Sequence, residues 1–157
     1  MPRIQDLLDA ELIVEDLQAT DKAGVLREFA AFLKSRGKVR DEDEVFDIVM
    51  QRESTTTGIG DGIAIPHGRM KGIPGVIVAF GRSRAGVDFQ SMDGKPAHLF
   101  FLFITPEERP GDHLAVLRRL ARITRNPALR EQLLRATDRQ EMHKLILDED
   151  EKYSPCR

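Results

Sequence analysis

The first third of the chain places its hydrophobic residues at helical spacing. Between positions 20 and 37 they fall three or four residues apart, at Val25, Leu26, Phe29, Phe32 and Leu33. This spacing puts them on one face of an α-helix. Thr20 or Asp21 can cap the N-terminus of that helix, and Gly37 can end it. The same spacing predicts a second helix from Asp41 to Arg52.

The middle of the chain alternates apolar runs of strand length with turn residues. Residues 76–80 and 97–104 are nearly unbroken apolar runs, which are typical of strands buried on both faces. Residues 87–89 can form a short pairing segment, and Asp93-Gly94 is typical of a turn between strands. Helices are therefore predicted on both sides of a central sheet.

Helical spacing returns after residue 106. Three helices are predicted, capped by Asp112, Asn126 and Asp138. The first carries Leu114, Leu117, Leu120 and Ala121 on its apolar face. The chain from position 148 onward is expected to be loosely ordered. The order of the elements predicts a single α/β domain over residues 1–150, followed by a flexible C-terminal tail over residues 151–157.

Composition and charge narrow the classes of function. The 157 residues are 41% hydrophobic and 32% charged, which fits one folded domain. No apolar run approaches the roughly 18 residues that a membrane span needs, and no signal-type stretch opens the chain, so we expect a cytoplasmic protein without membrane insertion. The 24 basic and 26 acidic residues form no basic block, which argues against nucleic-acid binding. A single cysteine, Cys156, excludes an internal disulfide.

The segment most suggestive of chemistry lies between the predicted helices and the strands. Residues 54–62, STTTGIGDG, form a loop of hydroxyl residues and glycines, which runs into a short extended segment and then into Pro66, His67 and Gly68. A neutral imidazole is a good nucleophile. Pro66 fixes the backbone before His67, and Gly68 leaves room for another protein's active site to approach. We therefore expect His67 to be the reactive residue of a glycine-rich active loop.

Two further residues could assist His67. His113 follows Asp112 at a predicted helix start, where anions are favoured, so it could donate a hydrogen bond to a phosphoryl group, or it could be a solvated first-turn histidine. Arg52 could reach the loop at residues 57–60 and bind phosphate in a fixed fork, or it could simply complement the C-terminus of its helix. His98 is expected to be structural and His143 to be solvated.

Other kinds of site fit the sequence poorly. The glycines of residues 58–62 precede an extended segment rather than a helix, and no lysine-hydroxyl pair follows them, so a nucleotide site is not expected. The histidines lack the paired spacing of metal ligands, so no metal or other cofactor is expected. No serine has the glycine-flanked setting of a hydrolase nucleophile.

Six segments resemble the type 2 enzyme IIA domains of the bacterial phosphotransferase system. They are RE at 52–53, TGIG at 57–60, GIAIPHG at 62–68, VDF at 87–89, DGKP at 93–96 and DHL at 112–114. The resemblance covers nearly the whole chain. It implies a mannitol-type enzyme IIA fold, in which a central mixed sheet is flanked by helices on both sides.

The resemblance also implies a phosphotransferase that carries phosphate on histidine. His67 would be phosphorylated at its tele nitrogen, Nε2, by an HPr-type phosphocarrier protein. Arg52 and His113 would be catalytic, and the backbone at Thr57, Gly58 and Gly60 would support the phosphoryl group. The orientation of Arg52 is not fixed by the sequence.

Three roles remain open for such a domain. The lone domain and the segments 62–69 and 93–96 look most like the nitrogen-regulatory branch, in which phosphorylation controls binding to regulated target proteins. A sugar-specific enzyme IIA of the fructose or mannitol type would instead pass phosphate to an enzyme IIB. A binding module that accepts no phosphate is the third reading, and a homodimer is also left open.

Overall fold

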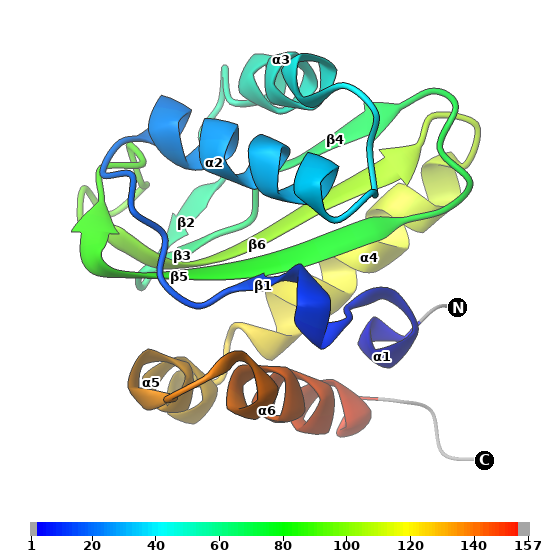
Figure 1. Cartoon of the computed structure of the whole chain (residues 1–157). Coiled ribbons are helices and arrows are strands. Elements are labelled where there is room, and N and C mark those ends of the chain that lie inside the picture. Colours follow the sequence, from blue (N-terminus) through cyan, green and yellow to red (C-terminus); the bar gives the residue numbers. More distant parts are fainter. Residues whose placement is uncertain (1–2, 154–157) are drawn as a thin grey trace.

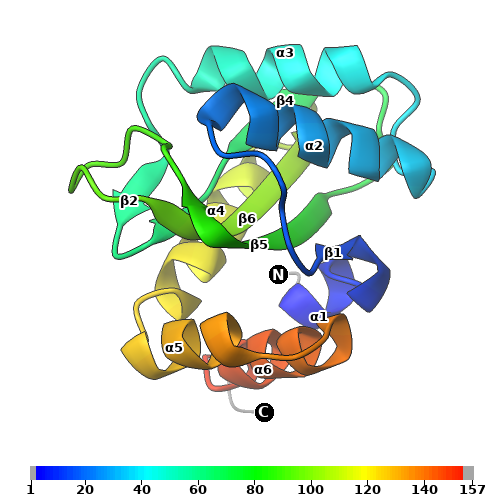
Figure 2. The same ribbon diagram turned by 60° about the vertical axis from the view of Figure 1, so that its left-hand side comes forward.

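The computed structural model describes residues 3–153 as three layers, with a β-sheet between two layers of helices (Figures 1 and 2). Helices α2 (Lys22–Ser35) and α3 (Glu42–Arg52) cover one face. Helices α4 (Pro110–Ile123), α5 (Pro127–Arg135) and α6 (Arg139–Glu151) lie on the other side, where α1 (Ile4–Leu7) contacts α6. No helix within residues 3–153 is long and apolar enough to cross a bilayer.

The sheet is mixed, as predicted. Its strands follow the order β1 (Ile13–Val14), β5 (Ile77–Val87), β6 (Ala97–Pro106), β3 (Ile63–Ala64) and β2 (Gly58–Gly60), and a short 3-10 turn, η1 (Ala10–Leu12), precedes β1. The β5–β6 and β2–β3 pairs are antiparallel, whereas β1 pairs with β5, and β3 with β6, in parallel.

A further short strand, β4 (His67–Met70), also pairs with β6 in parallel. It continues where β3 stops, because β3 lies opposite Leu99 and Phe100 and β4 begins opposite Phe103. The chain therefore runs along β6 in two steps, and His67 is the first residue of the second step.

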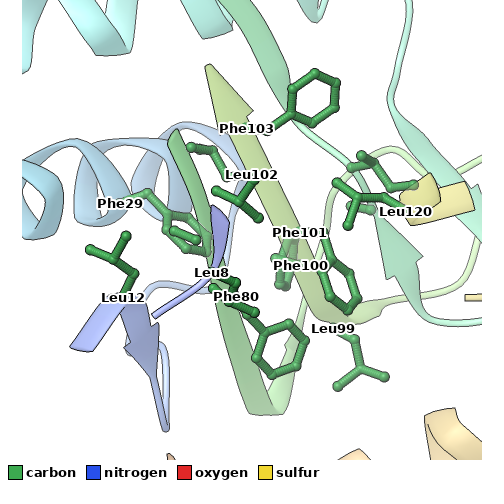
Figure 3. Close-up of a cluster of buried hydrophobic side chains, with 14 of the residues drawn as sticks. Leu8, Leu12, Phe29, Phe80, Leu99, Phe100, Phe101, Leu102, Phe103 and Leu120 are labelled. Atoms are coloured by element: carbon green, nitrogen blue, oxygen red, sulfur yellow. The ribbon is translucent and has the colours of Figure 1, made fainter. Parts of the chain in front are cut away.

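Both faces of the sheet are buried. Successive residues of a strand point to opposite faces, so neighbouring phenylalanines of β6 pack in different layers. The Phe100 ring lies 6.5 Å from that of Phe29 on α2, whereas the Phe101 ring lies 4.7 Å from that of Phe80 on β5 (Figure 3). The predicted two-sided burial of this apolar strand is confirmed.

Four of the predicted helices begin at the predicted caps. The carboxylates of Asp21, Asp41 and Asp138 and the amide oxygen of Asn126 accept hydrogen bonds from backbone N–H groups in the first turns of α2, α3, α6 and α5. Gly37 follows α2 with a φ of +72°, the left-handed conformation that ends helices at glycine.

The start of α4 differs from the prediction. The helix begins at Pro110, and Asp112 lies within its first turn rather than at the cap. Its buried face consequently holds Val116, Leu120 and Ile123, whereas Leu114 is exposed. The predicted apolar stripe is thus confirmed at Leu120, and Leu117 and Ala121 pack partly buried against the core, but the prediction is wrong at Leu114.

The C-terminal region is more ordered than expected. Helix α6 continues to Glu151, and Glu149 and Asp150 are buried, so the expectation of loose order from position 148 is wrong. The domain boundary at residue 150 stays a prediction. Residues 154–157 of the predicted tail, including Cys156, lie outside the described residues. The short elements α1 and β1 were not predicted.

Candidate functional site

His67 is held between two strands and stacked on an aromatic ring. It lies opposite Phe103 in the β4–β6 pair, and only 4% of its surface is exposed. The two rings are nearly parallel, 9° apart in plane, with centres 4.9 Å from each other. The orientation of the imidazole is therefore fixed by packing.

A hydrogen bond decides which nitrogen of His67 can react. Its Nδ1 lies 2.6 Å from the carbonyl oxygen of Ile65. A carbonyl can only accept, so Nδ1 must carry the proton and donate it. In the neutral ring Nε2 is then unprotonated, and its lone pair is available. Phosphorylation at Nε2, which the family resemblance implies, stays a prediction.

The structure brings His113 against His67. Its ring centre lies 5.1 Å from that of His67, in an edge-on arrangement, and 5.1 Å from that of Phe103. Its Nδ1 is 2.7 Å from the hydroxyl of Thr105, a buried residue of β6. The reading of His113 as a solvated first-turn histidine is therefore wrong.

Burial keeps both histidines neutral. Burial lowers the pKa of His67 from its ordinary value, and this effect exceeds the opposing one of the bond to Ile65. Burial, followed by repulsion from His67 and two nearby arginines, lowers the pKa of His113 to about 4. The arginines are Arg52 and Arg69, and each also lowers the pKa of His67.

The two arginines reach the site from different elements. Arg52 is the last residue of α3, and its exposed guanidinium donates to the carbonyl of Thr55, 3.1 Å away. Its reach to residues 57–60 stays a prediction. Arg69 follows His67 by two positions on β4 and therefore shares its face of the strand. Sequence analysis missed Arg69, because it placed this segment in a loop, where no period of two applies.

The hydroxyl-rich loop bonds mainly to the protein itself. The N–H and the hydroxyl of Thr57 both donate to the carboxylate of Glu53, and the N–H of Gly58 donates to the hydroxyl of Thr56, 3.0 Å away. The N–H groups of Thr57 and Gly58 are thus engaged inside the protein, whereas sequence analysis assigned them to a phosphoryl group. The corresponding role of Gly60, which has a φ of +97°, stays a prediction.

Comparison with known families identifies the chain. Residues 6–149 match the family described as "Phosphoenolpyruvate-dependent sugar phosphotransferase system, EIIA 2". The chain belongs to this enzyme IIA family. The match confirms the resemblance drawn from the sequence motifs.

Individual relatives of this enzyme IIA fall in two functional groups. A nitrogen regulatory protein of Bradyrhizobium diazoefficiens is 35% identical over 144 residues, which cover 91% of this chain and 94% of that protein. The fructose-specific EIIABC component of Bacillus subtilis is 38% identical over 135 residues. These residues cover 85% of this chain but only 21% of that longer protein.

Solved structures confirm the fold of the enzyme IIA. The nitrogen regulatory protein IIA-Ntr of Neisseria meningitidis superimposes with a TM-score of 0.85 at 34% identity, covering 91% of this chain and 98% of that chain. The mannitol IIA of Escherichia coli superimposes with a TM-score of 0.74 at 25% identity, covering 88% and 98%. The predicted mannitol-type architecture is therefore confirmed.

Gly68 of this enzyme IIA has a different role from the expected one. It is buried beneath α3, and a Cβ at this position would lie 2.4 Å from Cγ2 of Ile48. The absence of a side chain makes room for α3 and not for another protein. Gly68 thus lets α3, which ends in Arg52, pack closely on the strand that begins with His67.

The remaining histidines lie outside the site. His98 bonds through Nδ1 to the carbonyl of Ser83 at 2.8 Å, as expected of a structural residue. His143 bonds through Nε2 to the carbonyl of Leu8 at 2.8 Å and is half-buried, so the expectation of a solvated side chain is wrong. Within residues 3–153, no three histidine, cysteine or acidic side chains are grouped to hold a metal ion.

Proposed function

We propose that this enzyme IIA carries a phosphoryl group on Nε2 of His67, which it accepts from the phosphohistidine of an HPr-type protein. The observation that supports this most directly is the bond from Nδ1 of His67 to the carbonyl of Ile65, because it leaves Nε2 unprotonated. Burial adds to it by keeping the ring neutral, since a protonated imidazole has no lone pair to offer.

The transfer needs one bond to form and one to break. The lone pair of Nε2 attacks the phosphorus in line, the phosphorus–nitrogen bond of the donor breaks, and its electron pair returns to the donor's imidazole. The proton on Nδ1 of His67 stays in place, bonded to Ile65. Because phosphoramidate is exchanged for phosphoramidate, the transfer is readily reversible.

Groups around His67 would stabilise the charge of the moving phosphoryl group. Catalysis of such transfers rests on positioning and electrostatics, with charge spread over the equatorial oxygens. Arg52 and Arg69 supply positive charge from two sides. The Thr105 hydroxyl lies 2.7 Å from Nδ1 of His113. With this hydroxyl as the donor, Nε2 of the neutral His113 ring carries the proton and would donate it to a phosphoryl oxygen.

We further infer that the domain is of the nitrogen-regulatory type, so that phosphorylation of His67 controls its binding to target proteins. The likeness to nitrogen regulatory proteins of Bradyrhizobium and Neisseria over nearly their whole lengths supports this role. The sugar-specific alternative has its own support, because the fructose-specific relative from Bacillus subtilis is 38% identical. In that case an enzyme IIB would accept the phosphate.

Intact-mass spectrometry at neutral to alkaline pH tests both inferences. The protein is mixed with phosphoenolpyruvate, enzyme I and either a nitrogen-type or a sugar-type HPr. We expect one acid-labile phosphate, added faster by the nitrogen-type carrier. Faster charging by the sugar-type carrier would favour the sugar-specific role, and no phosphate from either carrier would indicate a binding module.

A further inference from the structure

A buried ion pair lies beneath the hydroxyl-rich loop. Lys22 is the first residue of α2, and Glu53 directly follows α3. The Lys22 ammonium is 2.9 Å from the Glu53 carboxylate, and only 9% and 1% of the two side chains are exposed. The ammonium also lies 4.8 Å from the centre of the Phe89 ring. The pair thus joins the start of one helix to the end of another.

A chain of hydrogen bonds runs from this pair to the imidazole of His67. The Glu53 carboxylate accepts from both the N–H and the hydroxyl of Thr57. The carbonyl of Thr57 accepts from the N–H of Ile65 at 3.1 Å. The carbonyl of Ile65 then accepts from Nδ1 of His67 at 2.6 Å. The chain of bonds thus passes through two residues, Thr57 and Ile65, each of which is bonded on both its N–H and its carbonyl side.

The loop is held at neighbouring points as well. The hydroxyl of Thr56 donates to the carbonyl of Phe89, 3.1 Å away, and the N–H of Met92 donates to the carbonyl of Gly58, 2.9 Å away. These bonds fix residues 56–58 to the segment after β5. Glu53 holds Thr57 itself, because its carboxylate accepts from both the N–H and the hydroxyl of that residue.

Stability alone is a weak explanation for this ion pair. Burying two charges is costly, and an apolar pair of similar size often gives equal or greater stability. An ionised carboxylate, however, can accept two hydrogen bonds from one residue and still face an ammonium. Glu53 makes all of these contacts, two with Thr57 and one with Lys22.

We propose that Glu53, compensated by Lys22, is a positioning residue that selects the reactive tautomer of His67. By fixing Thr57 it holds Ile65 in place, and the carbonyl of Ile65 keeps the proton on Nδ1 and leaves Nε2 free. The kinetic consequence rests on the proposed phosphocarrier function. The tautomer itself is a property of the unphosphorylated protein.

The test compares two buried ion pairs in the full-length protein. Glu53→Gln removes the charge with little change of shape, and it replaces one of the two carboxylate oxygens that accept from Thr57 by an amide NH2, which cannot accept. Asp150→Asn is the matched control, because it breaks the buried Arg119–Asp150 pair. The tautomer of His67 is read from the nitrogen shifts of 15N-labelled histidine, the transfer rate from intact mass, and the free energy of unfolding from urea denaturation.

In Glu53→Gln we expect a population of His67 with the proton on Nε2 and transfer slowed on the order of 10- to 100-fold, as small misplacements of reacting groups produce. In Asp150→Asn we expect a lower free energy of unfolding, with the tautomer and the rate unchanged. The proposal requires that Glu53→Gln change both the tautomer of His67 and the transfer rate. A change in only one of them, such as a slower rate with an unchanged tautomer, or a change in neither, overturns the proposal.

Two provisions keep the test decisive. If Glu53→Gln does not fold, Thr57→Val, which removes only the hydroxyl bond to Glu53, is held to the same criteria. If the wild-type protein accepts no phosphate, the proposed function fails, but the tautomer comparison still decides whether Glu53 positions His67.

Discussion

At His67, burial and the bond to Ile65 act on different properties of one ring. Burial lowers its pKa and so determines whether the ring carries a charge. The bond to Ile65 raises the pKa to a smaller extent, but it determines which nitrogen keeps the proton. Reactivity toward phosphorus requires both effects, because the nucleophile is a neutral ring with a free Nε2.

The pH dependence follows from the lowered pKa values. Below the ordinary pKa of 6.5, His67 and His113 bind protons in the unfolded chain more readily than in the folded protein. The folded state therefore loses stability as pH falls from about 6.5 toward 4. We expect NMR titration to place the midpoint of His113 near 4 and that of His67 below 6.5. A His67 midpoint at or above 6.5 would contradict the proposed role of burial.

The arginines should contribute to the rate and little to the stability, because both are exposed. We expect Arg52→Ala and Arg69→Ala each to slow phosphoryl transfer by about 100-fold, as loss of one charge-stabilising donor does. Arg52→Lys should recover part of the rate, since it keeps the charge without the fork. Arg84→Ala removes an exposed arginine of β5 as a control. Equal rates in all four variants would exclude both residues from the site.

At the scale of the elements, those set by local contacts could be predicted from the sequence, whereas those set by contacts between distant residues could not. The helix caps at Asp21, Asp41, Asn126 and Asp138 were predictable, because a cap bonds within its own first turn. Strand β4 was not predictable, because its sequence HGRM has no apolar alternation and its partner, β6, lies over thirty positions away.

The same distinction applies to the site. The motifs around His67, together with Arg52 and His113, could be recognised in the sequence. Arg69 could not, because its place beside His67 depends on the period of two that only the paired strand supplies. Similarly, the two bonds that Thr57 donates to Glu53 depend on the way the loop turns back after the end of α3.

Close packing between α3 and β4 gives a test at this scale. A Gly68→Ala methyl group would collide with Ile48, so we expect the free energy of unfolding to fall by about 1–3 kcal/mol. The double variant Gly68→Ala/Ile48→Ala removes the colliding atom and should be less destabilised than the sum of its single variants. Additive losses in urea denaturation would show that Ile48 does not explain the requirement for glycine.

At the scale of the whole molecule, one buried carboxylate joins the two ends of the described chain. Asp150 on α6 accepts two hydrogen bonds of 2.9 Å from Arg119 on α4, and one of 2.9 Å from the N–H of Ile4 on α1. Helices α1 and α6 are thereby tied to α4, the helix that carries His113. This arrangement explains why the C-terminal helix is ordered to Glu151.

Breaking this connection should be costly. Asp150→Asn removes the carboxylate charge that accepts two hydrogen bonds from the buried guanidinium of Arg119, so we expect the free energy of unfolding to fall by about 3–5 kcal/mol. Urea denaturation at neutral pH measures the change. A loss below about 1 kcal/mol would mean that the pair contributes little to holding α4 and α6 together.

The most direct test of the whole account is the position of the phosphate. The protein is labelled with 15N-histidine, phosphorylated by enzyme I and an HPr-type carrier, and examined by NMR at alkaline pH beside His67→Ala. The account predicts a single phosphate on Nε2 of His67, with the Nδ1 proton still bonded to Ile65, and none on the variant. A phosphate on Nδ1, on another residue, or on His67→Ala would contradict it.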